Sequence, residues 1–131
     1  MWPSLTTLST PSPFINMKLD TLLKQLEASP ESLVFSDVIM LIEELYLFTP
    51  VAFSNGALRN EAGQNSGSCK LFAFAKQHAL THQQTLHCFG SYYRVDVKQH
   101  PNGVDHQNIR NFIKTGWEGL SFVANPLQAK S

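Results

Sequence analysis

The fold of this chain is decided by residues 53–70, which read FSNGALRNEAGQNSGSCK. The stretch is small, polar and turn-forming, and it holds three of the seven glycines of the chain. It separates two halves in which apolar residues recur with helical spacing. Connections in compact domains usually span about 4–6 residues, and longer ordered loops are commonly functional. The sequence therefore predicts a long ordered Asn/Gly loop as the place where a binding site would lie.

The length and charge of the chain limit the classes to which it can belong. Its 131 residues fit one domain, and ten basic residues balance ten acidic ones. Nucleic-acid binding generally needs clustered Lys and Arg against phosphates, whereas the basic residues here are scattered. No apolar run reaches the ~20 residues of a membrane helix. We therefore expect neither a nucleic-acid partner nor a membrane partner.

The cysteines and histidines predict no metal site and no cofactor. Cys69 and Cys88 are expected to be free thiols, because the chain shows no export signal and no CxxC pair. The five histidines do not cluster with the spacing of metal ligands. His78 and His82 are four residues apart, but Thr81 is expected to cap a helix between them, so the two rings should not share a face.

The two ends of the chain differ in composition from its centre. Residues 1–16 are rich in Ser, Thr and Pro and predict a disordered lead-in, with Met1 and Met17 both open as translation starts. Residues 17–124 are expected to form a single domain. Residues 125–131, which begin with Asn-Pro, are expected to form a loose tail.

Apolar spacing and capping residues predict five helices. The first should span residues 18–28, because leucines recur with helical spacing and Pro30 ends the helix. The second should begin at Ser36-Asp37 and run to Thr49-Pro50. The third, fourth and fifth are expected to begin at Ser68, Thr81 and Asp105, with Gly116 ending the last.

Two short apolar stretches, Val51–Phe53 and Leu120–Val123, are expected to form strands that pair with each other. The fold class is therefore mainly α. We expect a compact bundle of about five short helices with the long ordered Asn/Gly loop and one small two-stranded β element.

Cys69 is one candidate for chemistry. At the start of a helix capped by Ser68, its thiol pKa would fall from ~8.5 into the range of ~3.5–7.5 when other positive groups help. His106 is the candidate base and Asp105 its orienting carboxylate, as in acyl-transfer enzymes. The amides around Ser68 would then form an oxyanion hole. The alternative is that Cys69 fills the core, Asp105 caps a helix and His106 is a first-turn residue.

The Asn/Gly loop offers a ligand site as a second candidate. Amides at the start of the third helix, together with Lys70, suit a phosphate or carboxylate. The P-loop pattern GxxxxGK[ST] is absent, so a nucleotide-hydrolysing site is not expected. The loop amides expected to line the site are those of Asn55, Asn60, Gln64 and Asn65. The alternative is that these side chains bond the backbone of their own loop.

Residues 105–110 are expected to form the second wall of that site. Arg110 would read a carboxylate or phosphate with its fork of donors, and Asn108 would lie beside it. The alternative is an ordinary solvated helix face.

Six segments of the chain together form a recognisable set: FTP at 48–50, FSNG at 53–56, NEAGQNSGSCK at 60–70, FGSYYR at 89–94, DHQNIR at 105–110 and GWEGLSF at 116–122. With these segments the chain resembles the HopJ type III effector family. The resemblance spans about residues 19–122 and brings no established reaction. It implies a bacterial cytoplasmic protein that a type III system delivers into host cells.

The resulting expectation is an effector-like protein of undefined biochemical activity. It would bind a small polar or anionic ligand, or a host or bacterial protein, through the Asn/Gly loop. Two alternatives are an enzyme that uses Cys69 and His106, and an interaction module that acts through its surface without a pocket.

Overall fold

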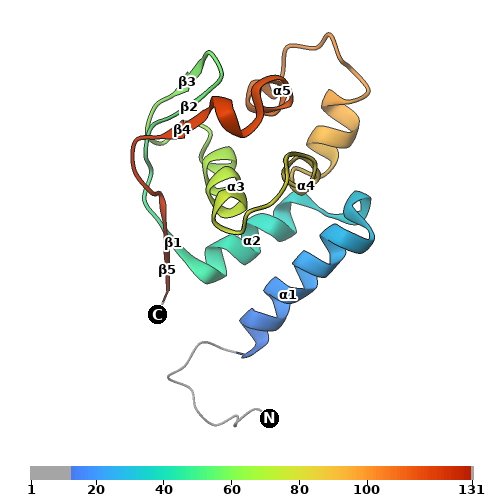
Figure 1. Cartoon of the computed structure of the whole chain (residues 1–131), viewed down its shortest axis with the longest axis vertical. Helices are drawn as coiled ribbons and strands as arrows, with labels where there is room; N and C mark the ends of the chain where they lie inside the picture. The colour runs from blue at the N-terminus through green and yellow to red at the C-terminus, as the bar shows by residue number, and fades with distance from the viewer. Residues whose placement is uncertain (1–12, 131) are drawn as a thin grey trace.

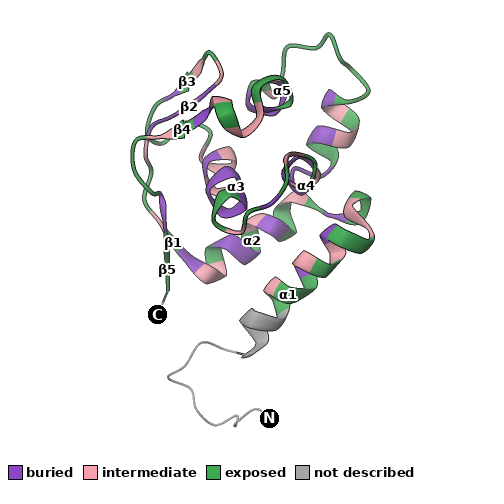
Figure 2. Cartoon of the chain, viewed as in Figure 1, coloured by how far each residue is buried: buried purple, intermediate pink, exposed green. Residues whose placement is uncertain are grey.

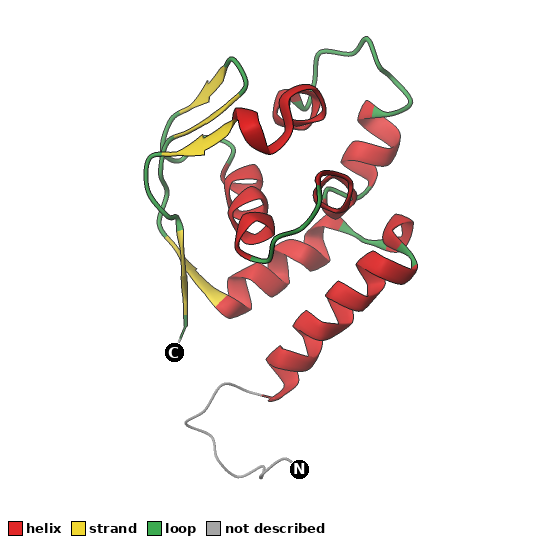
Figure 3. Cartoon of the chain, viewed as in Figure 1, coloured by secondary structure: helices red, strands yellow, loops and turns green. Residues whose placement is uncertain are grey.

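A computed structural model describes residues 13–130, with side chains described from residue 18 onward. It is mainly α-helical, as expected, with two small antiparallel sheets on one side (Figures 1 and 3). The helices are α1 Pro13–Ala28, α2 Phe35–Leu45, α3 Ser66–Gln77, α4 His82–Cys88 and α5 Gln107–Thr115. Short helical turns cover η2 Pro30–Ser32, η3 Tyr92–Val97 and η4 Gly116–Gly119. The strands are β1 Tyr46–Phe48, β2 Phe53–Asn55, β3 Leu58–Asn60, β4 Leu120–Phe122 and β5 Leu127–Ala129.

Helix α3 lies at the centre of the molecule (Figure 1). Its five consecutive residues from Leu71 to Ala75 are all buried, which Figure 2 shows as purple ribbon. A helix buried on consecutive positions is covered on every side rather than along one stripe. Phe72 is the hub of the packing, because its ring lies 5.3 Å from the Phe89 ring and 4.9 Å from the Phe112 ring. Through Phe72, α3 therefore packs against both α5 and the residue that follows α4.

The prediction of a loop over residues 53–70 was wrong, because most of that stretch has regular structure. Strands β2 and β3 form an antiparallel hairpin around Gly56, whose φ is +61°. Helix α3 begins at Ser66, so the irregular part is short. Alternating apolar residues did not reveal the hairpin, because two of its inward-facing residues are Asn55 and Asn60.

The predicted two-stranded element is part of a larger sheet. Strand β4 pairs antiparallel with β2, Phe53 opposite Phe122, so the two expected segments do pair, although the first strand spans Phe53–Asn55 rather than Val51–Phe53. With β3 on the other edge, the order is β3-β2-β4. Figure 3 shows these three strands together above the second sheet.

The second sheet was not expected. Helix α2 ends at Leu45 rather than near Thr49-Pro50, because β1 pairs with β5 from Tyr46 opposite Ala129 to Phe48 opposite Leu127. The tail therefore contains a strand where a loose segment was expected. Three-residue strands leave too short a pattern for the sequence to reveal.

Several helix starts differ from the predicted ones. Helix α1 ends at Ala28 as expected but begins at Pro13, inside the predicted lead-in, whose residues 1–12 lie outside the described residues. Helix α2 begins at Phe35 after Val34, without a side-chain cap. The N-cap residues of α3 and α5 are Asn65 and His106, not Ser68 and Asp105.

The capping box at Thr81 and the end of α5 at Gly116 are confirmed. The fourth helix is shorter than the apolar pattern after Thr81 predicts, since that pattern continues through Tyr92 whereas the helix stops at Cys88 and the chain turns at Gly90. Gly90 has a φ of +63°, and a Cβ there would lie 2.9 Å from the main-chain nitrogen of Phe35. Only glycine tolerates both conditions, so this residue forces the break before η3.

None of the helices in residues 13–130 is long and apolar enough to cross a membrane.

Candidate functional site

The first turns of α3 and α5 line one cavity of about 470 Å³, which we call the α3–α5 cavity. Gly67 and Ser68 contribute from α3, and Gln107, Asn108 and Ile109 from α5. Two segments far apart in the sequence, parts of 53–70 and 105–110, thus share one cavity. Ligand pockets in proteins commonly have volumes of about 300–1,000 Å³, so this cavity can hold a small molecule.

Both helices begin in the same way at this cavity. The residue before α3 is Asn65, with φ 51° and ψ 47°, and the residue before α5 is His106, with φ 49° and ψ 49°. Neither helix has a side-chain N-cap hydrogen bond. The first amide N–H groups of a helix lack partners inside it and carry the positive end of its dipole. Two such helix starts therefore favour negative charge in the cavity.

Aromatic rings form another wall of the cavity. The Phe35 ring lies 5.9 Å from the Phe89 ring and 5.2 Å from the Tyr92 ring. The Tyr92 ring in turn lies 4.9 Å from the imidazole of His106. All four side chains line the cavity. A flat apolar group would find suitable contacts on this wall.

A network of Asn side chains joins the hairpin to α5. Asn60 and Asn108 donate to each other, over 3.1 Å and 2.9 Å, and both are buried. Asn55, fully buried, donates to the main-chain oxygen of Asn108 over 2.8 Å and to its side-chain oxygen over 3.0 Å. Asn65 donates to Asn60 over 2.7 Å. The side-chain oxygen of Asn55 has no hydrogen-bond partner among the described residues.

These amide side chains therefore mainly stabilise the framework of the site, and only some of them line the cavity. Asn65 and Asn108 line the cavity, whereas Asn55 and Asn60 lie behind it. The sequence had left open whether these side chains bond a ligand or their own loop. Asn55 and Asn60 bond Asn108 across the two segments, which neither alternative described. Asn65 bonds Asn60 within its own segment, and Gln64 bonds the main chain of its own loop, as the second alternative expected.

Gln64 and Lys70 are engaged away from the cavity. The side-chain oxygen of Gln64 accepts from the main-chain nitrogen of Glu61 over 2.9 Å, which closes the turn before α3. The Lys70 ammonium lies 2.9 Å from a carboxylate oxygen of Glu43 and 4.8 Å from the centre of the Phe48 ring. Lys70 thus ties α3 to α2 and the strand that follows it.

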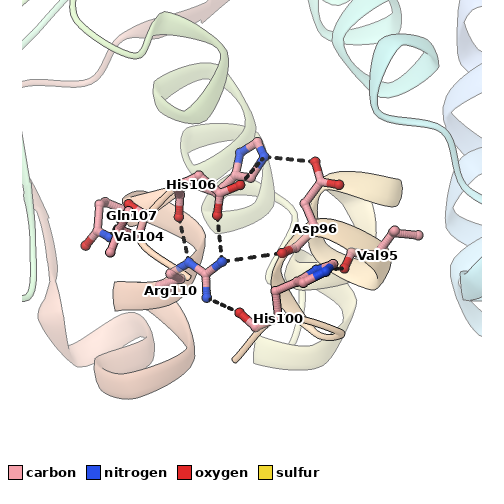
Figure 4. A network of polar contacts seen from close by, with 8 residues as sticks. Val95, Asp96, His100, Val104, His106, Gln107 and Arg110 are labelled. Carbon is pink, nitrogen blue, oxygen red and sulfur yellow. Dashed lines mark hydrogen bonds and ion pairs between the residues drawn. The ribbon is translucent and has the colours of Figure 1, made fainter. Parts of the chain in front are cut away.

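Arg110 holds the loop before α5, as Figure 4 shows. Its guanidinium donates to the main-chain oxygens of Asp105, His100 and Asp96 over 2.6, 2.8 and 3.3 Å. It also donates to the Asp105 carboxylate over 2.6 Å. The side chain is only 8% exposed. We had expected Arg110 to read a ligand, whereas these four bonds already occupy most of its five donors.

His106 connects that loop to the cavity. Its Nε2 lies 3.0 Å from a carboxylate oxygen of Asp96 and 3.9 Å from one of Asp105 (Figure 4). The hydrogen bond from Arg110 holds the pKa of the Asp105 carboxyl below its ordinary value. Asp105 therefore pairs with Arg110, rather than orienting the imidazole of His106 as predicted.

The architecture described above agrees with the comparisons. The model of the HopJ family, which is described as "HopJ type III effector protein", matches residues 19–127, which is most of the chain. The chain belongs to the HopJ family. A crystal structure of the unknown-function protein VPA0580 is similar to it, with a TM-score of 0.84 and 44% sequence identity over 99% of this chain and 100% of that one. No curated protein matches.

Cys69 of this HopJ-family chain faces the core. It is the fourth residue of α3, only 2% exposed, and it packs in the apolar cluster that includes Phe72. Burial raises the pKa of its thiol, which outweighs the lowering by a hydrogen bond at Val51 and by the Lys70 charge. No hydrogen bond among the described side chains joins Cys69 to His106. Burial also raises the pKa of Cys88, to about 12.

We expect both thiols to react slowly with iodoacetamide in the folded protein at neutral pH, because the thiolate is the nucleophile and both groups are buried. Rates measured against pH for Cys88→Ser, and for Cys88→Ser combined with His106→Ala, should be the same. Unfolding in urea should restore ordinary reactivity. Fast alkylation of Cys69 below neutral pH that disappears with His106→Ala would instead support the enzyme hypothesis.

Among residues 18–130, no group of three His, Cys, Asp or Glu side chains comes together in a way that could hold a metal ion.

The sequence reasoning missed the aromatic wall. The apolar pattern that follows Thr81 runs through Phe89 and Tyr92, and it predicts that both lie on one face of a longer fourth helix. Phe35 was not considered, although it directly precedes the expected start at Ser36-Asp37. A signal was present at Gly90, since a glycine inside an apolar helical pattern weakens the helix prediction and can mark the end of a helix.

Proposed function

We propose that this protein binds a small organic anion in the α3–α5 cavity. The observation that carries the proposal is that two helices begin at one cavity and that neither has a side-chain cap. Anions are commonly bound at helix starts, where amide donors and the dipole act together. The anionic group would lie at Gly67, Ser68 and Gln107.

The remainder of the ligand would lie on the aromatic wall. Phe35, Phe89 and Tyr92 offer ring faces and edges, so a flat body attached to a carboxylate or phosphate suits both walls. Cationic side chains contribute little here, since Lys70 pairs with Glu43 and Arg110 with Asp105. We therefore propose that main-chain amides supply most of the recognition of the charge.

The test replaces Ser68 by Asp. This third residue of α3 lies in the first helical turn, where a carboxylate stabilises the helix by about 0.3–1 kcal/mol. The same carboxylate would occupy the proposed anion position and repel a bound anion. We expect Ser68→Asp to raise the free energy of unfolding and to abolish binding of the probe benzoate.

The measurement is a titration with benzoate, followed by the NMR shifts of the main-chain amides of Gly67, Ser68, Gln107 and Asn108. Benzamide, which has the same ring without the charge, should cause much smaller shifts. Ser68→Asn, a neutral residue of nearly the same size as Asp, should still bind. Benzoate binding that is equal in Ser68→Asp, or shifts elsewhere only, would contradict the proposal.

Family membership supports a second proposal, that the protein is made in a bacterial cytoplasm and exported by a type III system. The sole basis is the family description, which names its members type III effector proteins. The test is the amount of protein in the medium of a secreting strain. Equal amounts from a strain without the secretion ATPase would contradict the proposal.

A further inference from the structure

A second cavity, of about 400 Å³, lies between α4, η3 and α5, and we call it the α4–α5 groove. Six of its lining residues carry the argument: Leu86, Tyr93, Val97, Lys98, Ile113 and Lys114. Of the residues that line the α3–α5 cavity, Gln107 is shared with this groove. The two sites therefore differ in almost all of their surroundings.

The floor of the groove is apolar. Leu86, Tyr93 and Val97 are buried, with relative exposures of 1%, 6% and 3%. Ile113 stands at one side on α5 with 41% of its surface exposed. Ile109 and Phe112 of the same helix face the core, so Ile113 extends the apolar stripe of α5 outward into the groove. A large apolar side chain placed there would cover Ile113 and gain contacts with the floor.

The sides of the groove carry positive charge. Lys98 and Lys114 are exposed, and within residues 18–130 neither takes part in an ion pair. No acidic side chain lines the groove. Arg110 also lines the groove, but its charge is paired with the Asp105 carboxylate over 2.6 Å. The charge of the two lysines is thus available to a molecule outside the chain.

We propose that the α4–α5 groove docks an acidic peptide segment of a partner protein. One apolar side chain of that segment lies between Leu86, Val97 and Ile113, and the flanking carboxylates meet Lys98 and Lys114. Charge complementarity selects the partner, because a basic segment would be repelled by both lysines. Exposed residues stand on both sides of the groove, Lys98 on one and Ile113 with Lys114 on the other, which suits an extended segment.

The experiment uses an array of short synthetic peptides, probed with the labelled full-length protein. Each peptide has Leu or Ser at the centre and either Glu or Lys at the flanking positions. We expect binding when Leu is flanked by Glu, and little binding when either feature is replaced. The affinity of the best peptide is then measured by fluorescence anisotropy at two salt concentrations, and it should fall at the higher one.

The variant is Lys98→Glu combined with Lys114→Glu. We expect its affinity for the acidic peptide to fall by about tenfold or more, because attraction becomes repulsion at two positions. The matched control is Lys24→Glu combined with Lys76→Glu, which changes the net charge equally and lies away from the groove. The control should bind as the unmodified protein does. A separate Ile113→Ser variant should also weaken binding.

Three results would overturn the proposal. They are the absence of any preference for acidic Leu peptides, equal loss in the control and the groove variant, and displacement of the peptide by benzoate with NMR shifts at Lys98. The last would assign the groove to small anions. Because benzoate binding at Gly67 and Ser68 is followed separately, the failure of either proposal leaves the other testable.

Discussion

Replacing Asn108 by Ala should lower the free energy of unfolding by about 3 kcal/mol, one of the two largest effects we expect. The side chain of Asn108 both accepts from and donates to Asn60, and it also accepts from Asn55. Truncation would remove three hydrogen bonds between buried amides, although the side-chain oxygen of Asn60 would still accept from Asn65. Each buried group left unpaired costs about 1–3 kcal/mol. Asn55 would keep one bond, to the main-chain oxygen of residue 108. Urea unfolding followed by circular dichroism measures the change.

The control for this prediction is Gln64→Ala. Gln64 is an exposed amide of the same segment with one hydrogen bond, to the Glu61 main chain, so its loss should cost less than about 1 kcal/mol. A second variant, Asn108→Asp, keeps the shape but cannot donate while ionised. A loss for Asn108→Ala as small as that for Gln64→Ala would show that the hairpin and α5 are held together by apolar packing alone.

Asn108 also illustrates why the site was only partly predictable. The sequence placed residues 53–70 and 105–110 together as two walls, and the structure indeed gives them one cavity. It could not show that Asn55 and Asn60 both bond Asn108. Such pairing joins residues about fifty positions apart, and its cost and benefit depend on burial that a local pattern does not contain.

The helices were predictable where the signal was local. The leucine spacing that begins at Leu19 and the capping box at Thr81 each act within one or two turns, and both predictions agree with the structure. The misplaced starts of α3 and α5 have a common cause. Asn65 and His106 adopt left-handed backbone conformations before their helices, which residue type does not reveal. By type alone Ser68 is as good a capping residue as Asn65, and Asp105 is a better one than His106.

The small sheets could not be predicted from local sequence patterns, for a different reason. Strand β5 exists because β1 lies next to it, and each is three residues long. Strand β2 is flanked by β3 and β4 and buries Asn55 where an apolar residue would be expected. Pairing of short strands is decided by tertiary contacts rather than by propensity.

Replacing Arg110 by Met should have the second large effect, a loss of about 3 kcal/mol in the free energy of unfolding. The guanidinium binds three main-chain oxygens and the Asp105 carboxylate, so its removal frees the whole loop that Figure 4 shows. Hydrogen bonds to charged groups are each worth about 1.5–3 kcal/mol. Hydrogen exchange at residues 97–105 should become faster in this variant than in the unmodified protein.

Two further variants separate the roles that Arg110 could have. Arg110→Lys keeps the charge but lacks the planar fork, so it should recover only a minor part of the stability. Lys114→Met removes an exposed charge on the same helix and should change stability by less than about 0.5 kcal/mol. If Arg110→Met instead leaves stability unchanged and abolishes benzoate binding, then the side chain reads the ligand, as the sequence alone had suggested. The contacts favour the other outcome, because a guanidinium that already donates four hydrogen bonds to its own loop has few free donors for an anion.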